Sequence, residues 1–167
     1  MSESIDALDF ILREHHRQRQ VFATLEEVAA AESCDPALLA SLAEFIRFDM
    51  TLHVIDEEED FFPLLRQRCL PDDDIGPVLD QMQSEHAEDR RLALLVRDVL
   101  QRALVAQRPV KSIEGGAEAL RSFAEHQKHH LVMENAVLAP FARKRLTEDD
   151  LNRLAERFSA RRGTAAA

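Results

Sequence analysis

The sequence predicts an all-α protein: an antiparallel up-down-up-down four-helix bundle with a short C-terminal fifth helix. Three observations predict this fold class. The 167 residues include only four glycines and six prolines, whereas the helix-favouring residues Leu, Ala, Glu, Arg and Gln are abundant. Apolar residues recur at spacings of three, four and seven along four long segments. Short connections join these segments, so consecutive helices are expected to run antiparallel.

The first three helices follow from their apolar stripes and from the segments that interrupt them. The first helix ends at the polar stretch 31–36 and carries the stripe Leu8, Ile11, Leu12, His15, Phe22 and Leu25. Asp35 before Pro36 is a good N-cap with proline at the first helical position, so a second helix should start there. After a turn over 70–77, a third helix carries His86 on its stripe.

Two further helices complete the chain. The fourth helix should run from near Ser112 to the region of Arg143. Thr147 and the three acidic residues after it resemble a helix start, which predicts a short fifth helix and a frayed tail from Gly163 to Ala167. A chain of this length fits one domain, so 1–167 is expected to be a single domain.

The composition argues against several classes of function. The formal net charge is −10, and the Lys and Arg residues are interspersed with acids, which disfavours nucleic acid and anionic membranes as partners. The N-terminus lacks signal-peptide features, and no stretch approaches the roughly 18 apolar residues of a membrane span, so a cytoplasmic protein is expected. Cys34 and Cys69 stand alone, as ordinary reduced thiols do. The sequence does not determine the oligomeric state, and a homodimer is one candidate.

The strongest functional signal is a phrase that occurs twice, His-x-x-x-Glu with a proline six residues after the glutamate. It comprises His53 and Glu57 in the second helix, and His130 and Glu134 in the fourth. Residues four apart project from the same helix face, so each pair can present an imidazole nitrogen and a carboxylate to one centre. The two prolines lack a backbone N–H, so each should kink or end its helix just past these residues.

One inward histidine on each of the other two long helices, His15 and His86, completes a set of six polar residues. Burying four imidazoles and two carboxylates without a cation would cost several kcal/mol, so the set predicts a metal site. Six ligands are too many for one tetrahedral zinc. Shared between two metals, with Glu57 and Glu134 as bridges, they leave positions open for a bridging oxygen and an exogenous ligand. Imidazole and carboxylate without thiolate suit iron, with manganese or zinc as competitors.

These motifs resemble the hemerythrin-like, or HHE cation-binding, family, whose pattern is His, His-x-x-x-Glu, His and His-x-x-x-Glu over four helices. The match covers nearly the whole chain, from Glu14-His15 to the segment that ends at Pro140. The resemblance implies two iron ions with an oxo or hydroxo bridge, and it implies as their ligands His15, His53, Glu57, His86, His130 and Glu134.

The chain departs from the oxygen-carrying hemerythrins at two positions. Those proteins place a second histidine four residues after the one in the third helix, and an aspartate five residues after the last histidine. Here Arg90 and Asn135 occupy these places. The five-histidine oxygen-carrier site is therefore absent, which disfavours a simple reversible oxygen carrier.

Other polar residues lie near the predicted ligands. His16 and His129 are expected to face solvent. His126 and Asp49 each lie one turn before a predicted ligand histidine and are candidates to orient a ligand, and His126 is also weighed as a direct ligand. Glu58 directly follows a predicted bridge and is a candidate to approach the metals, although the acidic run around it is more simply a solvated face.

A di-iron centre with open positions supports two classes of function. The first is redox chemistry, in which the centre binds or reacts with peroxide, O2 or NO, with peroxide-decomposing or oxidase activity and a role in oxidative-stress defence. Some members of the family that the chain resembles decompose peroxide. The second is an iron- or oxygen-binding or sensing module without turnover. A metal-free structural bundle is the third interpretation. No catalytic side chain beyond the metal ligands is expected.

Overall fold

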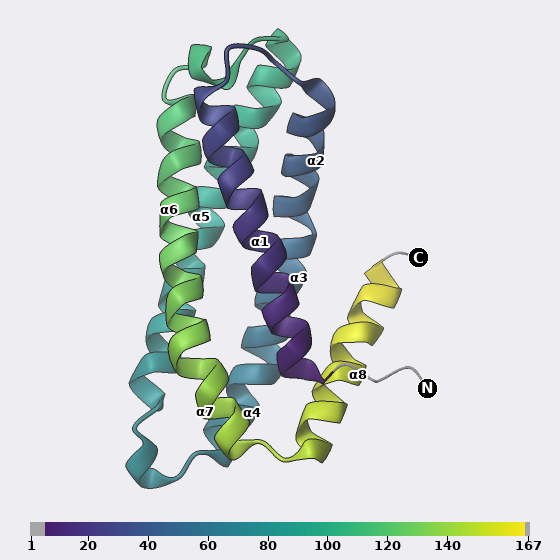
Figure 1. Ribbon diagram of the computed structural model, residues 1–167, viewed down its shortest axis with the longest axis vertical. Helices are drawn as coiled ribbons and strands as arrows, with labels where there is room; N and C mark the ends of the chain where they lie inside the picture. The colour runs from purple at the N-terminus through teal and green to yellow at the C-terminus, as the bar shows by residue number, and fades with distance from the viewer. Residues whose placement is uncertain (1–5, 166–167) are drawn as a thin grey trace.

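The computed structural model describes residues 6–165, which fold into helices without a strand (Figure 1). The main helices are α1 (Ala7–Ala30), α2 (Pro36–Arg47), α3 (Asp49–Ile55), α4 (Phe62–Arg68), α5 (Gly76–Ala106), α6 (Gly116–Met133), α7 (Ala139–Arg145) and α8 (Glu148–Ala165). Two π-helical segments, η1 (Asp56–Phe61) and η4 (Glu134–Leu138), join α3 to α4 and α6 to α7. Short 3-10 turns lie at η2 (Pro71–Asp73) and η3 (Val110–Ser112).

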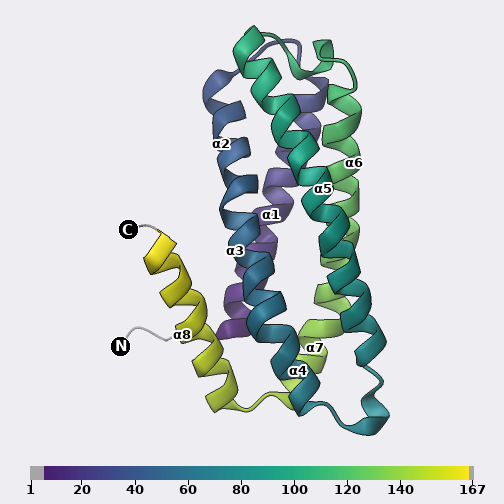
Figure 2. The same cartoon turned by 180° about the vertical axis from the view of Figure 1, so that it is seen from behind.

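The long helices form the predicted antiparallel bundle. In Figures 1 and 2, α1 and α5 run in one direction, and the continuous helices α2 to α4 and α6 to α7 run in the other. Helix α6 packs against both α1 and α5, and the α2 to α4 helix packs against the same two from the other side. Helix α8 lies outside the bundle, against α1 and η1. The predicted fold class is confirmed.

A polar layer divides the apolar core of the bundle into two clusters. One cluster lies toward the α1–α2 connection and includes Phe22, Phe45 and Phe123. The other lies toward the α4–α5 connection and includes Phe62 and Leu79. Five of the six predicted ligands fall between the clusters along their helices, and the sixth, His130, directly precedes Leu131, the last residue of the first cluster in α6. The apolar residues on both sides exclude water from the layer, which strengthens electrostatic interactions inside it.

The helix boundaries show where local sequence decides the structure. Asp35 caps α2 by accepting a hydrogen bond from Leu38 N–H (3.1 Å), as predicted. The fourth helix begins at Gly116 rather than near Ser112, because Gly115 has a left-handed φ of 67° that interrupts helical geometry. The expected frayed tail is wrong at its start, since α8 continues through Gly163 to Ala165; residues 166–167 lie outside the described part.

The prolines of the repeated phrase do not end their helices, so of the two expected outcomes, a kink or an end, the helix end is wrong. Pro63 lies in α4 and Pro140 in α7, and both helices continue for several residues. Instead, the regular α-helical hydrogen bonding is interrupted by a π-segment just before each proline. The backbone N–H of Phe62 bonds the carbonyl of Glu57, five residues back, and Ala139 bonds Glu134 in the same way. In Figure 1 the helix changes direction between α6 and α7.

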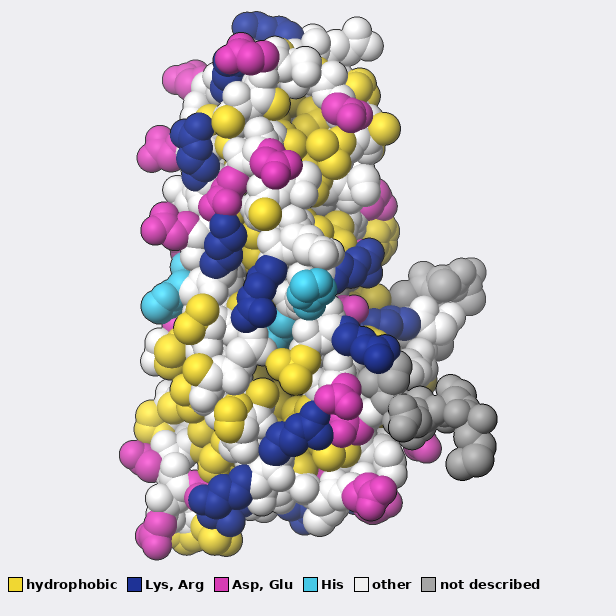
Figure 3. All heavy atoms as spheres, in the orientation of Figure 1, with side chains coloured by type: hydrophobic (Ala, Val, Ile, Leu, Met, Phe, Trp, Pro, Cys, Tyr) yellow, Lys and Arg dark blue, Asp and Glu magenta, His cyan; other side chains and the backbone are white. Residues whose placement is uncertain are grey.

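The surface carries charges of both signs. On the face shown in Figure 3, basic and acidic side chains are interspersed, and histidine side chains reach the surface near mid-height. No helix within residues 6–165 combines the length and the apolar character that crossing a bilayer requires.

Candidate metal centre

The six predicted ligands meet in the polar layer as two overlapping groups. Each group offers four ligand atoms that all lie within 4.8 Å of one another. The first group is His15, His53, Glu57 and Glu134, and the second is Glu57, His86, His130 and Glu134. Every one of these side chains is buried. Both glutamates belong to both groups, as two bridging carboxylates would.

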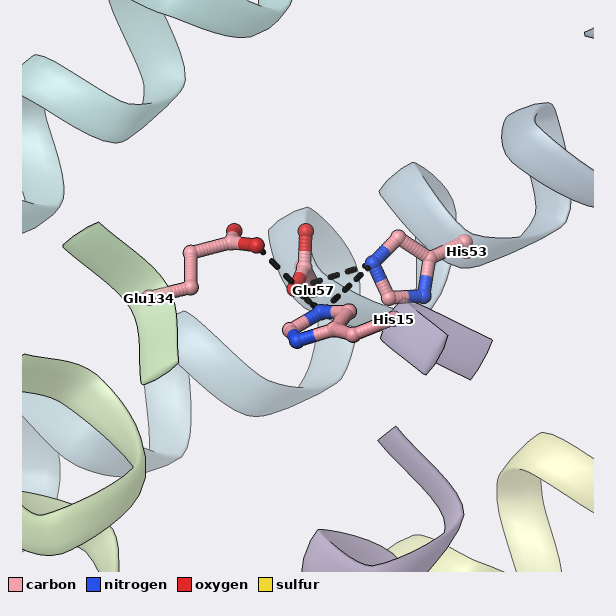
Figure 4. Close-up of side chains that lie close together, drawn as sticks. All are labelled: His15, His53, Glu57 and Glu134. Atoms are coloured by element: carbon pink, nitrogen blue, oxygen red, sulfur yellow. Dashed lines mark hydrogen bonds and ion pairs between the residues drawn. The ribbon is translucent and has the colours of Figure 1, made fainter. Parts of the chain in front are cut away.

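The first half of the site pairs the histidines of α1 and α3 (Figure 4). The Nε2 atoms of His15 and His53 lie 3.1 Å apart. Glu57 Oε1 lies 3.4 Å from the Nε2 atom of His53, and Glu134 Oε2 lies 3.3 Å from that of His15. The two imidazoles therefore face a carboxylate from each of the π-segments.

The second half repeats this arrangement with the histidines of α5 and α6. The Nε2 atoms of His86 and His130 lie 3.2 Å apart. Glu57 Oε2 lies 3.3 Å from His86 Nε2, and Glu134 Oε1 lies 3.0 Å from His130 Nε2. Each carboxylate therefore directs one oxygen to each histidine pair.

Three of the four imidazoles are oriented through their outer nitrogens. Each Nδ1–H donates a hydrogen bond to an oxygen: His15 to Asn135 (2.9 Å), His86 to Glu58 (3.0 Å) and His130 to Glu85 (2.8 Å). Since the acceptors are carboxylate or amide oxygens, the proton of a neutral imidazole resides on Nδ1. The lone pair is then on Nε2, which points inward. This is the arrangement in which proteins present histidine to a metal.

The inner atoms fit a cation. Glu57 Oε2 and both oxygens of Glu134 are buried and receive no hydrogen bond from the described residues, although imidazole nitrogens lie close to them. Two ligand atoms about 2.1 Å from one metal, at right angles, lie about 3.0 Å apart. The Nε2 pairs at 3.1 and 3.2 Å match that separation. Lone pairs that converge without a donor between them are stabilised by a positive ion.

With no cation between them, burial and mutual charge push the pKa values of these groups apart. Burial lowers the pKa of His53 to about 3. Burial also opposes the protonation of His130, but the negative charges of Glu134 and Glu57 outweigh it and raise the pKa of His130 to about 10. Burial raises the pKa of Glu134, and the charge of Glu57 raises it further. Protons therefore compete with a metal for this cluster.

The remaining candidates lie outside the two groups. His16 and His129 are exposed, as predicted. His126 pairs with the buried Asp89, with 2.8 Å between Nε2 and Oδ1. Asp49 does not orient a ligand; it forms an ion pair with Arg17 at 2.7 Å, because its position on the helix faces α1 near the surface. Glu58 contacts the outer nitrogen of a histidine and lies outside both candidate ligand groups.

Sequence reasoning missed the partners of two imidazoles. Asn135 was interpreted only as a departure from another pattern, yet it holds His15. Glu85 directly precedes His86 in the sequence and was not among the predicted site residues, yet it holds His130 on the facing helix. The signal was present in the sequence, because Glu58 and Asn135 both directly follow a glutamate of the repeated phrase.

The fold and the site define a helical bundle with a buried histidine and glutamate cluster for metal binding. A comparison with protein families agrees with this class: residues 6–142 match the family described as the hemerythrin HHE cation binding domain. The chain belongs to this family. A comparison with curated proteins gave no match.

Proposed function

We propose that this chain is a non-heme di-iron protein that binds or reacts with a small oxygen or nitrogen species, namely peroxide, O2 or NO. One observation carries the proposal: Glu57 and Glu134 each direct one oxygen to each histidine pair. With the six residues as ligands, each histidine pair would supply two imidazole nitrogens to one ion, and Glu57 and Glu134 would each supply one oxygen to each ion. Non-heme iron with imidazole and carboxylate ligands keeps positions open for a small molecule.

The ligand chemistry favours iron over the competing metals. Neither free cysteine, Cys34 or Cys69, belongs to the two ligand groups. Thiolates would favour softer metals, whereas imidazole with carboxylate suits iron and, less specifically, manganese or zinc. When bound, the iron pair supplies electrons and Lewis acidity. The chain supplies the remaining requirements, which are orientation, exclusion of water and charge.

The protein side chains would control how a small ligand meets the centre. Phe62 stacks on His86, with ring centroids 5.8 Å apart and planes inclined by 8°, which shields this imidazole from water. An apolar groove of about 140 Å³ between α3 and α5 is lined by Met50, Val54 and Glu58, among other residues. Because Glu58 contacts His86 directly, the groove lies beside the site and suits the approach of a small molecule with low charge.

Iron loading of the protein tests the proposal. The purified protein is stripped with a chelator, reloaded with ferrous iron and exposed to air, and iron per chain and near-ultraviolet absorption are measured. We expect two irons and a ligand-to-iron charge-transfer band. Glu134→Ala should lose both, whereas Glu125→Ala, an exposed glutamate on the same helix, should keep both. A wild-type protein that takes up no iron would contradict the proposal.

Hydrogen peroxide then distinguishes redox turnover from binding. Sustained oxygen release by the iron-loaded protein, absent in Glu134→Ala, supports peroxide decomposition. A stable spectral change on addition of peroxide, O2 or NO, without turnover, supports a binding or sensing module. The two outcomes differ in whether the ligand is consumed.

A further inference from the structure

Helix α8 lies outside the segment that matches the family, yet it packs against two elements that carry candidate ligands. The family match ends at residue 142, and α8 spans Glu148–Ala165. It packs against α1, which carries His15, and against η1, which carries Glu57. Figure 2 shows α8 beside the bundle, next to the α3 to α4 helix.

Three arginines of α8 neutralise two buried acids of η1. Asp56 forms ion pairs with Arg161 and, at 2.6 Å, with Arg162. Asp60 pairs with Arg161 at 2.7 Å and with Arg157 at 2.6 Å. The carboxylates of Asp56 and Asp60 are almost completely buried, with 1% and 0% of the side chain exposed. Buried acids of this kind strongly destabilise a fold when their partners are removed.

Arg162 also joins η1 to α1. Its Nη2 donates to Glu14 Oε2 at 3.2 Å, while Nη1 bonds Asp56. The guanidinium lies 4.5 Å above the ring of Phe10, which packs against Phe158 of α8. Glu14 and Asp56 directly precede His15 and Glu57, so one arginine contacts both neighbours of these two ligands.

This contact distinguishes the two halves of the site. Glu85, directly before His86, accepts a hydrogen bond from His130. Glu14, directly before His15, occupies the equivalent place, but it pairs with Arg162 instead. The fourth histidine, His53, contacts its neighbours through the inner nitrogen Nε2 within residues 6–165, so the half of the site that contains His15 and His53 has one oriented outer nitrogen, that of His15. The α8 contact thus replaces, in one half, the carboxylate-to-histidine bond of the other half.

We propose that α8 is a positioning helix for the metal centre and that Arg161 and Arg162 are its positioning residues, which fix His15 and Glu57 through Glu14 and Asp56. The inference rests on the proposed role of the six residues as ligands. It follows from the location of Glu57 in η1, because π-helical turns are rare and short and the ion pairs of Asp56 and Asp60 hold this one against α8. Without the arginines, Asp56 and Asp60, four residues apart on one face, would repel each other.

The test compares iron binding by full-length variants. Arg161→Gln/Arg162→Gln is expected to weaken iron binding at least tenfold in competition with a chelator and to shift the charge-transfer band, whereas Arg161→Lys/Arg162→Lys should recover much of both. Arg145→Gln is the matched control. Arg145 also pairs with a mostly buried acid, Asp73 (2.8 Å), but that pair lies beside the α4–α5 connection, away from the ligands. Arg145→Gln should lower the urea midpoint of the protein without changing its iron affinity or its spectrum.

The outcomes separate this inference from the proposed function. If the wild type binds no iron, both fail. If the wild type binds two irons and the glutamine variant binds them with the same affinity and spectrum, only the positioning role is overturned. If the double variant does not fold, Arg162→Gln alone provides the same comparison. An equal loss of iron affinity in Arg145→Gln would show that the effect is general destabilisation and would also overturn the inference.

Discussion

Glu58 and Asn135 occupy equivalent places in the two halves of the site: each directly follows a shared glutamate and accepts a hydrogen bond from an outer histidine nitrogen. Glu58 holds His86 at 3.0 Å, and Asn135 holds His15 at 2.9 Å. The two acceptors differ in charge, however, and Glu58 is further engaged by Arg90 at 3.2 Å. The repeated phrase and the residue after it therefore contribute the acceptors that orient two histidines as well as the proposed ligands.

Asn135→Leu should weaken metal binding about 10- to 100-fold, the usual effect of removing an acceptor that orients a ligand. The change leaves His15 Nδ1 without its partner in the buried layer. Asn135→Asp keeps an acceptor at the same position and should preserve binding. Competition with a chromophoric chelator measures both, and equal affinities for Asn135→Leu and the wild type would contradict the orienting role.

Glu134→Leu should destabilise the metal-free protein at pH 7 and abolish the two-metal site. The carboxylate of Glu134 lies 3.0 Å from His130 Nε2, and its charge helps to raise the pKa of His130 to about 10. Removing one partner of a buried charge pair is strongly destabilising, by about 3–5 kcal/mol. Urea denaturation of the chelator-treated proteins provides the comparison. Unchanged or increased stability of the variant would contradict the charge pairing of Glu134 with His130.

The metal-free protein should lose stability as the pH rises from 7 to 10. The pKa values of His15 and His86 are raised, and that of His130 is raised from 6.5 to about 10. A raised folded-state pKa stabilises the fold fully below the unfolded value, and this contribution disappears as the pH rises through the folded value. Urea midpoints at several pH values measure the effect.

His130→Gln is the control for this pH dependence. The variant lacks the histidine whose pKa is raised to about 10, so its decline between pH 7 and 10 should be smaller. Iron-loaded wild type should also show a smaller decline, because a nitrogen that binds metal takes up no proton. Equal stability of the metal-free wild type at pH 7 and pH 10 would contradict the attribution of the pH dependence to the raised histidine pKa values.

Ferrous iron should raise the unfolding temperature of the chelator-treated protein. Free metal at 100 times the dissociation constant stabilises a one-site protein by about 2.7 kcal/mol, which corresponds to at least about 5 °C for a domain of this size. Calorimetry with and without iron measures the shift. Glu134→Ala provides the comparison, and an equal shift in that variant would place the stabilising metal elsewhere.

Much of the fold was predictable because the signals are local. Helical periodicity gave the bundle, and Asp35 before Pro36 gave the start of α2. The meeting of six polar residues was predictable because polar side chains at core positions of four helices require a common partner, and the structure does bring them together. The π-segments were not predictable from the prolines alone. A proline lacks a backbone N–H, which predicts an irregular helix but does not say whether that helix will end, kink or form a π turn.

Contacts between distant segments account for what the sequence did not indicate. Asp49 was expected to orient a ligand histidine, but the break between α2 and α3 lies at Phe48, directly before it, and its side chain pairs with Arg17 of α1. Asp56 and Asp60, and Arg157 and Arg161, form complementary pairs four residues apart. Only the packing of α8 against η1 brings these two pairs together.

Crystallography of the iron-loaded protein, with anomalous data collected at the iron edge, tests the central claim most directly. Two anomalous peaks about 3.5 Å apart are expected in the polar layer. One should be bound by His15 and His53, the other by His86 and His130, and both by Glu57 and Glu134. A single peak, or peaks away from these side chains, would contradict the dinuclear centre.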